Sequence, residues 1–255
     1  MLRRISIFAY GTVSYLIFFA TFLYAVGFIG NIFVPKSMDS GPVRPFWEAL
    51  MVNSGLLAVF ALQHSIMARQ WFKKAWTRIV PEEAERSTYT LFSSLALILL
   101  FAFWQPMGGV IWHLENQAAR CLMYSLCTFG FLLVLVSTFL INHFDLFGLR
   151  QVWLCLIGKP YTKLTFAKPW IYKQVRHPLY LGWLFAFLAT PTMTVTHLLF
   201  AVATTAYIFL AIQFEERDLV RVHGLAYQQY REEVPMILPV RIGAKSQPAV
   251  AGQTA

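Results

Sequence analysis

The chain alternates between long, uninterrupted apolar runs and shorter polar connections. Four runs have the length of a single membrane-crossing helix, because a bilayer core about 30 Å thick needs roughly 20 helical residues. These four runs cover residues 5–33, 46–67, 88–104 and 121–141. Each run is therefore expected to cross the membrane once.

A fifth apolar run, 179–214, is too long for one crossing, since a continuous helix at ~1.5 Å per residue would measure roughly 54 Å. Its middle carries Pro191 among four threonines. Proline breaks the backbone hydrogen-bond ladder, and β-branched threonines suit a turn. The run is expected to form a helical hairpin, inward from 179 to about 192 and back from 197 to 214, with a first arm that is short for a full crossing. A short re-entrant hairpin and a single kinked helix stay open, since membrane helices tolerate proline.

Composition agrees with this pattern. Of the 255 residues, 58% are hydrophobic and only 13% charged, whereas soluble domains carry about 25% charged residues. The predicted fold class is an all-α integral membrane protein, with four transmembrane helices plus a C-terminal membrane helical hairpin. Residues 1–242 are expected to form a single membrane domain, and the small, polar segment 243–255 a disordered tail.

Basic residues predict the orientation. All of them except Lys36, Arg44 and Arg120 fall at the N-terminus, in the two large connections or after the hairpin. Basic connections stay in the cytoplasm, which predicts cytoplasmic N- and C-termini. The even number of crossings that this requires favours the hairpin. The net charge of +9 is then explained by orientation and anionic lipid rather than by nucleic acid. The first run is also too long for the apolar part of a cleavable signal peptide.

Two polar clusters flank the predicted hairpin. Arg176-His177-Pro178-Leu179-Tyr180-Leu181-Gly182 precedes it and Glu215-Glu216-Arg217 follows it, so both should emerge at the cytoplasmic surface. Pro178 suits a first helical turn, whose amide groups and dipole favour an anion such as a carboxylate. Gly182 permits close approach of a ligand or another helix, and the glutamates can accept hydrogen bonds from an ammonium group or a ribose. The pattern fits a zwitterionic ligand, while an ordinary helix start and a solvated helix end remain the alternative.

These clusters, together with Gly224, Tyr227, Tyr230 and Val234-Pro235, resemble the C-terminal signature of the isoprenylcysteine carboxyl methyltransferase superfamily over residues 172–239. The resemblance implies S-adenosyl-L-methionine as the cofactor, bound at the membrane surface without a Rossmann domain. The cofactor-binding residues that it implies are Arg176, His177, Pro178, Tyr180, Gly182, Glu215, Glu216 and Tyr227.

The N-terminal two-thirds is similar to bacterial methanethiol S-methyltransferases, which overlap nurim-like and NnrU-like membrane proteins. The segments that carry this similarity include 63–69, 85–89, Trp104-Gln105-Pro106 and 142–151. The resemblance implies methylation of methanethiol to dimethyl sulfide by in-line methyl transfer to a thiolate. Another small thiol, a lipid-linked carboxylate and a non-enzymatic nurim-like role stay open. The expected partners are a small volatile thiol and the lipid bilayer, with no nucleic acid and no obligate protein partner.

Thiol methylation requires a thiolate, yet a thiol with a pKa near ~8.5 is mostly neutral at pH 7. Ionisable groups near the cytoplasmic helix ends are therefore the catalytic candidates. They are His64, Arg86, His143, Asp145 and Arg217. His64 lies within a membrane segment, which favours a functional role, although a packing histidine is the alternative.

The other candidates carry alternatives too. His143 and Asp145 can form a pair that orients a base, or belong to a solvated loop. Arg86 can reach the site or pair with Glu85, and Arg217 can balance the paired glutamates. Tyr227 can stack on the cofactor or anchor the chain at the membrane interface. No metal site is expected, because the three cysteines match no zinc or redox spacing.

Overall fold

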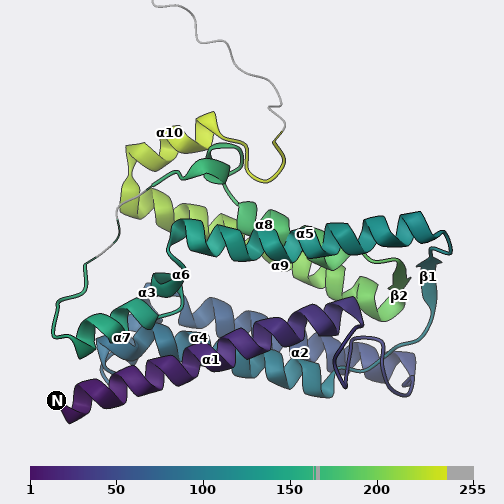
Figure 1. The fold of residues 1–255 in the computed structure, drawn as a ribbon, viewed down its shortest axis with the longest axis horizontal. Helices are drawn as coiled ribbons and strands as arrows, with labels where there is room; N and C mark the ends of the chain where they lie inside the picture. The colour runs from purple at the N-terminus through teal and green to yellow at the C-terminus, as the bar shows by residue number, and fades with distance from the viewer. Residues whose placement is uncertain (163, 165–166, 240–255) are drawn as a thin grey trace, which may run out of the picture.

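The computed structural model describes residues 1–162, 164 and 167–239. Long helices run from one end of the molecule to the other in alternating directions (Figure 1). Five of them are long and apolar enough to cross a membrane. They are α1 (Leu2–Gly30), α2 (Phe46–Met67), α4 (Glu82–Phe103), α5 (Gln117–Ile141) and α9 (Val195–His223). The shorter apolar helix α8 (Pro178–Leu188) runs beside α5, so the predicted all-α membrane fold is confirmed.

The long helices form two layers. Helices α1, α2 and α4 pack together in one, and α5, α8 and α9 in the other (Figure 1). Short helices gather at the end that holds the N-terminus. They are α3 (Gln70–Trp76), α6 (His143–Leu146), α7 (Leu149–Leu156), the 3-10 helix η1 (Trp170–Lys173) and α10 (Leu225–Glu233). The opposite end carries strands β1 (Val110–His113) and β2 (Thr192–Thr194).

The predicted hairpin is present and reaches the far end of the bundle. Helix α8 has 11 residues, roughly 17 Å, which is less than the thickness of a bilayer core. Residues 189–194 continue from it in non-helical form, and β2 pairs antiparallel with β1, joining Thr192 to His113. Because β1 lies in the connection between α4 and α5, the turn of the hairpin lies at the same end as that connection. A single kinked helix is therefore excluded.

Local sequence explains where the hairpin turns. The Thr194 hydroxyl accepts a hydrogen bond from the His197 amide at 3.0 Å and caps α9, since a side-chain oxygen at this position satisfies an otherwise free helical amide. Thr192 and Thr194 belong to the small sheet, which the sequence did not predict. Its two strands lie about 80 residues apart in the chain, so no local pattern indicated their pairing.

The helix bounds also differ from the apolar runs. Helix α4 begins at Glu82 rather than near residue 88, because Glu82, Glu83 and Glu85 form a polar first turn ahead of the apolar part. Acidic side chains are favoured at that end of a helix by its dipole. Apolar length alone therefore marks the part of the helix within the bilayer and misses its extension into water.

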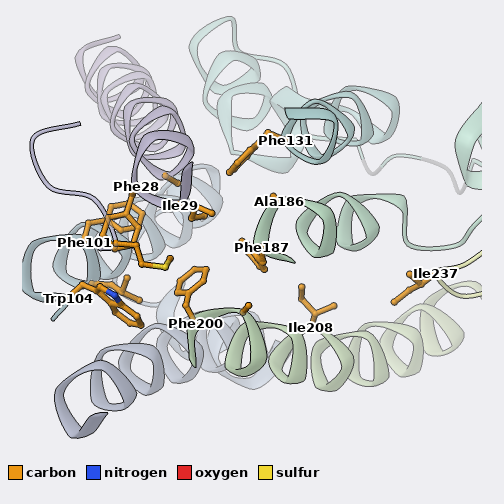
Figure 2. Packing of buried hydrophobic residues seen from close by; sticks show 14 of the residues in the cluster. Phe28, Ile29, Phe101, Trp104, Phe131, Ala186, Phe187, Phe200, Ile208 and Ile237 are labelled. Carbon is orange, nitrogen blue, oxygen red and sulfur yellow. The ribbon is translucent and has the colours of Figure 1, made fainter. Parts of the chain in front are cut away.

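Aromatic side chains join the two layers. Figure 2 shows Phe28, Phe101 and Trp104 of the first layer facing Phe187 and Phe200 of the hairpin. Ring centroids of Phe28 and Phe101 lie 4.6 Å apart, and those of Trp104 and Phe200 lie 5.7 Å apart. This packing fixes the hairpin against the first layer, and so fixes the position of both of its ends.

The predicted disordered tail, 243–255, lies outside the described residues. The single membrane domain over 1–242 stays a prediction.

Candidate active site

The two polar clusters meet in a buried group of charges. Arg176 Nε lies 2.8 Å from Glu216 Oε1, and His177 Nε2 lies 3.0 Å from the same oxygen. Arg231 of α10 approaches the other carboxylate oxygen at 3.0 Å. The side chains of Arg176, His177 and Glu216 are only 10%, 4% and 6% exposed. The hairpin therefore brings its two ends together, as predicted.

The segment after α10 covers this charge cluster and hydrogen-bonds to it. Arg176 Nη1 donates hydrogen bonds to the carbonyls of Arg231 and Val234 at 2.7 and 2.6 Å. The amides of Arg176 and His177 donate to the carbonyls of Pro235 and Met236 at 2.9 and 3.0 Å. These two amides precede α8, so the anion site predicted for the amides of its first turn, which Pro178 opens, stays a prediction. Pro178 occupies the first helical turn as expected and is buried.

Glu215 differs from its neighbour because its side chain is 45% exposed. Its Oε2 lies 3.9 Å from His177 Nδ1, and its carboxylate interacts with the half-buried phenol of Tyr180. Glu215 and Tyr180 thus present polar atoms beside the buried charges and are open to a ligand. Arg176, His177 and Glu216 have their polar atoms bound to one another.

Two predicted cofactor contacts have packing roles instead. A Cβ atom on Gly182 would lie 2.7 Å from the Gly130 carbonyl oxygen and 2.8 Å from the Val134 amide nitrogen. Gly182 therefore permits close approach of another helix, α5, rather than of a ligand. The Tyr227 ring is 2% exposed and packs with Tyr230 and Val234, which differs from an open stacking surface and from an interfacial anchor.

The neighbouring phenol of Tyr230 shows why this region is closed. It donates a hydrogen bond to the Tyr172 carbonyl at 2.5 Å and so ties α10 to η1. Burial raises the pKa of Tyr230 to about 12, against a smaller lowering by Arg176, so the phenol stays a donor at physiological pH. The two tyrosines stabilise the cap over the charge cluster.

A second polar group joins α2, α4 and α9, three of the helices long and apolar enough to cross a membrane. His64 Nε2 lies 2.8 Å from the Tyr89 hydroxyl, and His64 Nδ1 lies 3.1 Å from Ser93 Oγ. Next to it, Ser65 Oγ and the Tyr207 hydroxyl are 2.9 Å apart. Tyr180 lies within electrostatic range of both Tyr89 and Tyr207, which places this group near the Glu215 region. Sequence reasoning missed Tyr207, because a tyrosine inside a long apolar run carries no local signal.

Basic side chains lie at the same end of the helix bundle. Arg69 pairs with Asp218 of α9 at 3.3 Å, and Lys73 with Glu85 at 3.9 Å. Arg86 is half-buried, and Glu85 pairs with Lys73 rather than with Arg86. Burial lowers the pKa of Lys73, and the charge of Arg86 lowers it further, which places the two cations near each other. Arg69, Lys73 and Arg86 thus form a cationic group around the ends of α2 and α4.

The structure separates the predicted pair of His143 and Asp145. The Thr138 hydroxyl donates to the Leu135 carbonyl, so it accepts from His143 Nδ1 at 2.8 Å. His143 Nε2 then accepts from the Tyr15 hydroxyl, also at 2.8 Å. Asp145 instead pairs with Arg150 at 2.8 Å. Neither residue lies in a solvated loop, since both are buried, and the predicted His–Asp pair is wrong.

Arg217 also differs from its expected role. Its side chain is exposed, while Arg176 and Arg231 supply the charges that balance Glu216. Position in sequence placed Arg217 beside the glutamates, but helical geometry directs adjacent residues to different faces.

These observations define an integral-membrane protein with a charged, partly open site at one membrane surface and a polar group buried below it. Over nearly its whole length the chain is similar to proteins named methanethiol S-methyltransferase. It is 56% identical over 245 residues to that of Crocosphaera subtropica, covering 96% of each chain. It is 51% identical over 238 residues to that of Mycobacterium tuberculosis, covering 93% of this chain and 98% of the relative. The chain belongs to the methanethiol S-methyltransferase family.

A more distant similarity extends to proteins named nurim. Nurim of Xenopus laevis is 30% identical over 175 residues, which cover 66% of this chain and 61% of nurim. No family model matches the chain, and no solved structure matches it.

Proposed function

We propose that this protein methylates methanethiol to dimethyl sulfide with S-adenosyl-L-methionine as the methyl donor. The reaction takes place at the cytoplasmic end of the helix bundle, in a bacterial inner membrane with both termini in the cytoplasm. The observation that carries the proposal is the meeting of Arg176 and His177 with Glu216, which leaves Glu215 and Tyr180 open beside them. The names of the relatives supply the thiol.

The charges present fit such a donor. S-adenosyl-L-methionine carries an ammonium group, a carboxylate, ribose hydroxyls and a positively charged sulfur. Glu215 and Tyr180 provide acceptors for the ammonium group or the ribose. The cationic group of Arg69, Lys73 and Arg86 provides partners for the carboxylate, since charge-assisted hydrogen bonds are the stronger ones. The buried cluster of Arg176, His177 and Glu216 acts indirectly by fixing the start of α8.

When bound, the donor supplies an electrophilic methyl group on its positively charged sulfur. His64 accepts the proton of the thiol, and Tyr89, 2.8 Å from His64 Nε2, holds the imidazole in place. The chemistry that the bound donor would supply is in-line transfer of this methyl group to the thiolate sulfur, with the neutral thioether of the donor as leaving group. Helices α2, α4 and α9 exclude water around His64, which strengthens the attraction between thiolate and donor. Orientation of the two sulfur atoms supplies a further part of the rate.

The test uses purified membranes with methyl-labelled S-adenosyl-L-methionine and methanethiol, and measures labelled volatile dimethyl sulfide. His64→Gln is expected to lower kcat by roughly 10²–10⁴-fold, the range for loss of a general base. Glu215→Gln is expected to raise the KM for the donor at least tenfold. The matched controls are His113→Gln, at the opposite end of the bundle, and Glu232→Gln, on the exposed face of α10. Both should behave as wild type.

The outcomes separate the alternatives. If the protein binds the donor but does not methylate methanethiol, then methanethiol is the wrong acceptor and another molecule receives the methyl group. Wild-type protein that binds no donor would overturn the proposed function altogether and would favour a non-enzymatic role.

A further inference from the structure

An apolar groove opens between α2 and α9 at membrane depth. Its volume is about 170 Å³. Its walls are Leu57, Ala58, Phe60 and Ala61 of α2 and Ala203, Thr204 and Tyr207 of α9. For comparison, an apolar cavity of about 150 Å³ can hold a benzene molecule. The groove therefore accommodates a small uncharged molecule.

The outer side of the groove faces the surroundings of the bundle. Ala58 is exposed, and the neighbouring Val59 and Val202 are 47% and 58% exposed. Ala61 lies six residues before the end of α2, roughly 9 Å at ~1.5 Å per residue. In a membrane, this opening would be at the level of the hydrocarbon core. A molecule that dissolves in the bilayer can enter there without crossing the cytoplasmic surface.

The inner side of the groove touches the polar group around His64. The Phe60 ring stacks on His64 with centroids 5.3 Å apart, and the Tyr207 hydroxyl lies 2.9 Å from Ser65 Oγ. From Tyr207, the Glu215 region is eight residues further along α9, roughly 12 Å. The groove thus connects the apolar surroundings with the polar group that the proposed reaction uses.

We propose that this groove is the thiol-binding subsite, which admits a small, uncharged alkyl thiol laterally from the bilayer and selects it by size. This inference rests on the proposed function and adds its substrate path. Ala58, Ala61 and Ala203 keep the groove open because they carry only a methyl group. Leu57 and Phe60 set its width, and Tyr207 positions the sulfur near His64.

The first test narrows the groove. Ala203→Leu and Ala61→Leu are each expected to raise the KM for methanethiol at least tenfold, because the added side chain fills the space. The dissociation constant of S-adenosyl-L-methionine should stay within twofold of wild type, which also shows that each variant is folded. Val202→Leu places the same leucine side chain next to Ala203 on the exposed side and serves as the control, with an unchanged KM for the thiol.

The second test widens the groove. Leu57→Ala is expected to raise kcat/KM for 1-propanethiol relative to methanethiol at least fivefold. A charged thiol such as 2-mercaptoethanesulfonate should remain a poor substrate for wild type and variant, because it does not partition into the bilayer.

These results distinguish the two proposals. Suppose that the wild-type protein makes dimethyl sulfide and that Ala203→Leu and Val202→Leu both keep the wild-type KM for methanethiol. The groove proposal is then wrong, while the proposed function stands. The groove proposal is equally wrong if Leu57→Ala leaves chain-length preference unchanged. If wild-type protein binds donor yet methylates no thiol, the proposed function fails first.

Discussion

The guanidinium Nε of Arg176 and the carboxylate of Glu216 lie 2.8 Å apart although 40 positions separate them in the chain. Their contact joins the start of α8 to the end of α9, and Arg231 adds α10 to the same carboxylate. Buried ion pairs give little net stability relative to apolar packing, yet breaking one is costly. The pair therefore defines how the hairpin ends and α10 fit together.

Removing the Glu216 carboxylate should destabilise the protein strongly. Glu216→Ala leaves the buried Arg176 charge without its partner, and loss of one member of a buried pair costs about 3–5 kcal/mol. The measurement is thermal unfolding of the detergent-purified protein. Glu215→Ala is the matched control, because its side chain is 45% exposed, and it should alter donor binding with little change in Tm. Equal Tm values for the two variants would contradict the structural role of Glu216.

Contact between α5 and α8 should depend on the missing side chain at Gly182. A methyl group there would meet backbone atoms of Gly130 and Val134 at 2.7 and 2.8 Å, and backbone cannot give way cheaply. Gly182→Ala is expected to cost about 1–3 kcal/mol through overpacking. Gly55→Ala in α2 is the control, since nothing lies within 4 Å of the added atom, and there alanine should be neutral or stabilising. Similar unfolding temperatures for both variants would show that the helices separate to make room.

The sequence predicted the membrane class, the four single crossings and the hairpin, because apolar length and charge placement are read directly along the chain. The meeting of Arg176 with Glu216 followed from the hairpin, since its ends had to emerge together. Roles within the site were harder to predict. Glu215 and Glu216 are adjacent and chemically identical, and only their position on the helix decides that one is exposed and the other buried.

Partners on other helices explain the remaining errors. His143 and Asp145 are two residues apart, but His143 bonds to Tyr15 of α1, and Asp145 pairs with Arg150, five residues further along in α7. Tyr207 and Ser65 are 142 positions apart, and no local spacing relates them. Pairings of this kind depend on how the two helix layers pack, which a single sequence does not specify.

The half-buried Arg86 should contribute to donor binding rather than to the thiol step. It lies close enough to Lys73 for its charge to lower the pKa of that amine, and it belongs to the cationic group assigned to the donor carboxylate. Arg86→Gln is expected to raise the KM for S-adenosyl-L-methionine by about tenfold, near 1.4 kcal/mol, with the KM for methanethiol unchanged. Arg78→Gln is the control, because Arg78 is exposed in the connection between α3 and α4. A selective rise in the thiol KM would remove Arg86 from the donor site.

Burial of His143 should make the protein sensitive to acid. Desolvation lowers the pKa of His143 below its ordinary value of 6.5, so the unfolded chain takes up a proton at a higher pH than the folded one. Stability from this residue is complete above pH 6.5 and is lost as the pH falls through that value toward the lower folded pKa. The contacts with Thr138 and Tyr15 also favour the neutral ring, because only a neutral imidazole donates from Nδ1 and accepts at Nε2.

His143→Gln removes this titration while keeping an amide that can donate and accept hydrogen bonds. The variant should be less stable than wild type at pH 7.5, but its Tm should fall less between pH 7.5 and pH 5. Other groups titrate equally in both proteins, so the difference between the two pH profiles isolates His143. Parallel profiles would mean that protonated His143 is accommodated in the folded protein, and the neutral hydrogen-bonded ring between α1 and α5 would then be the wrong description.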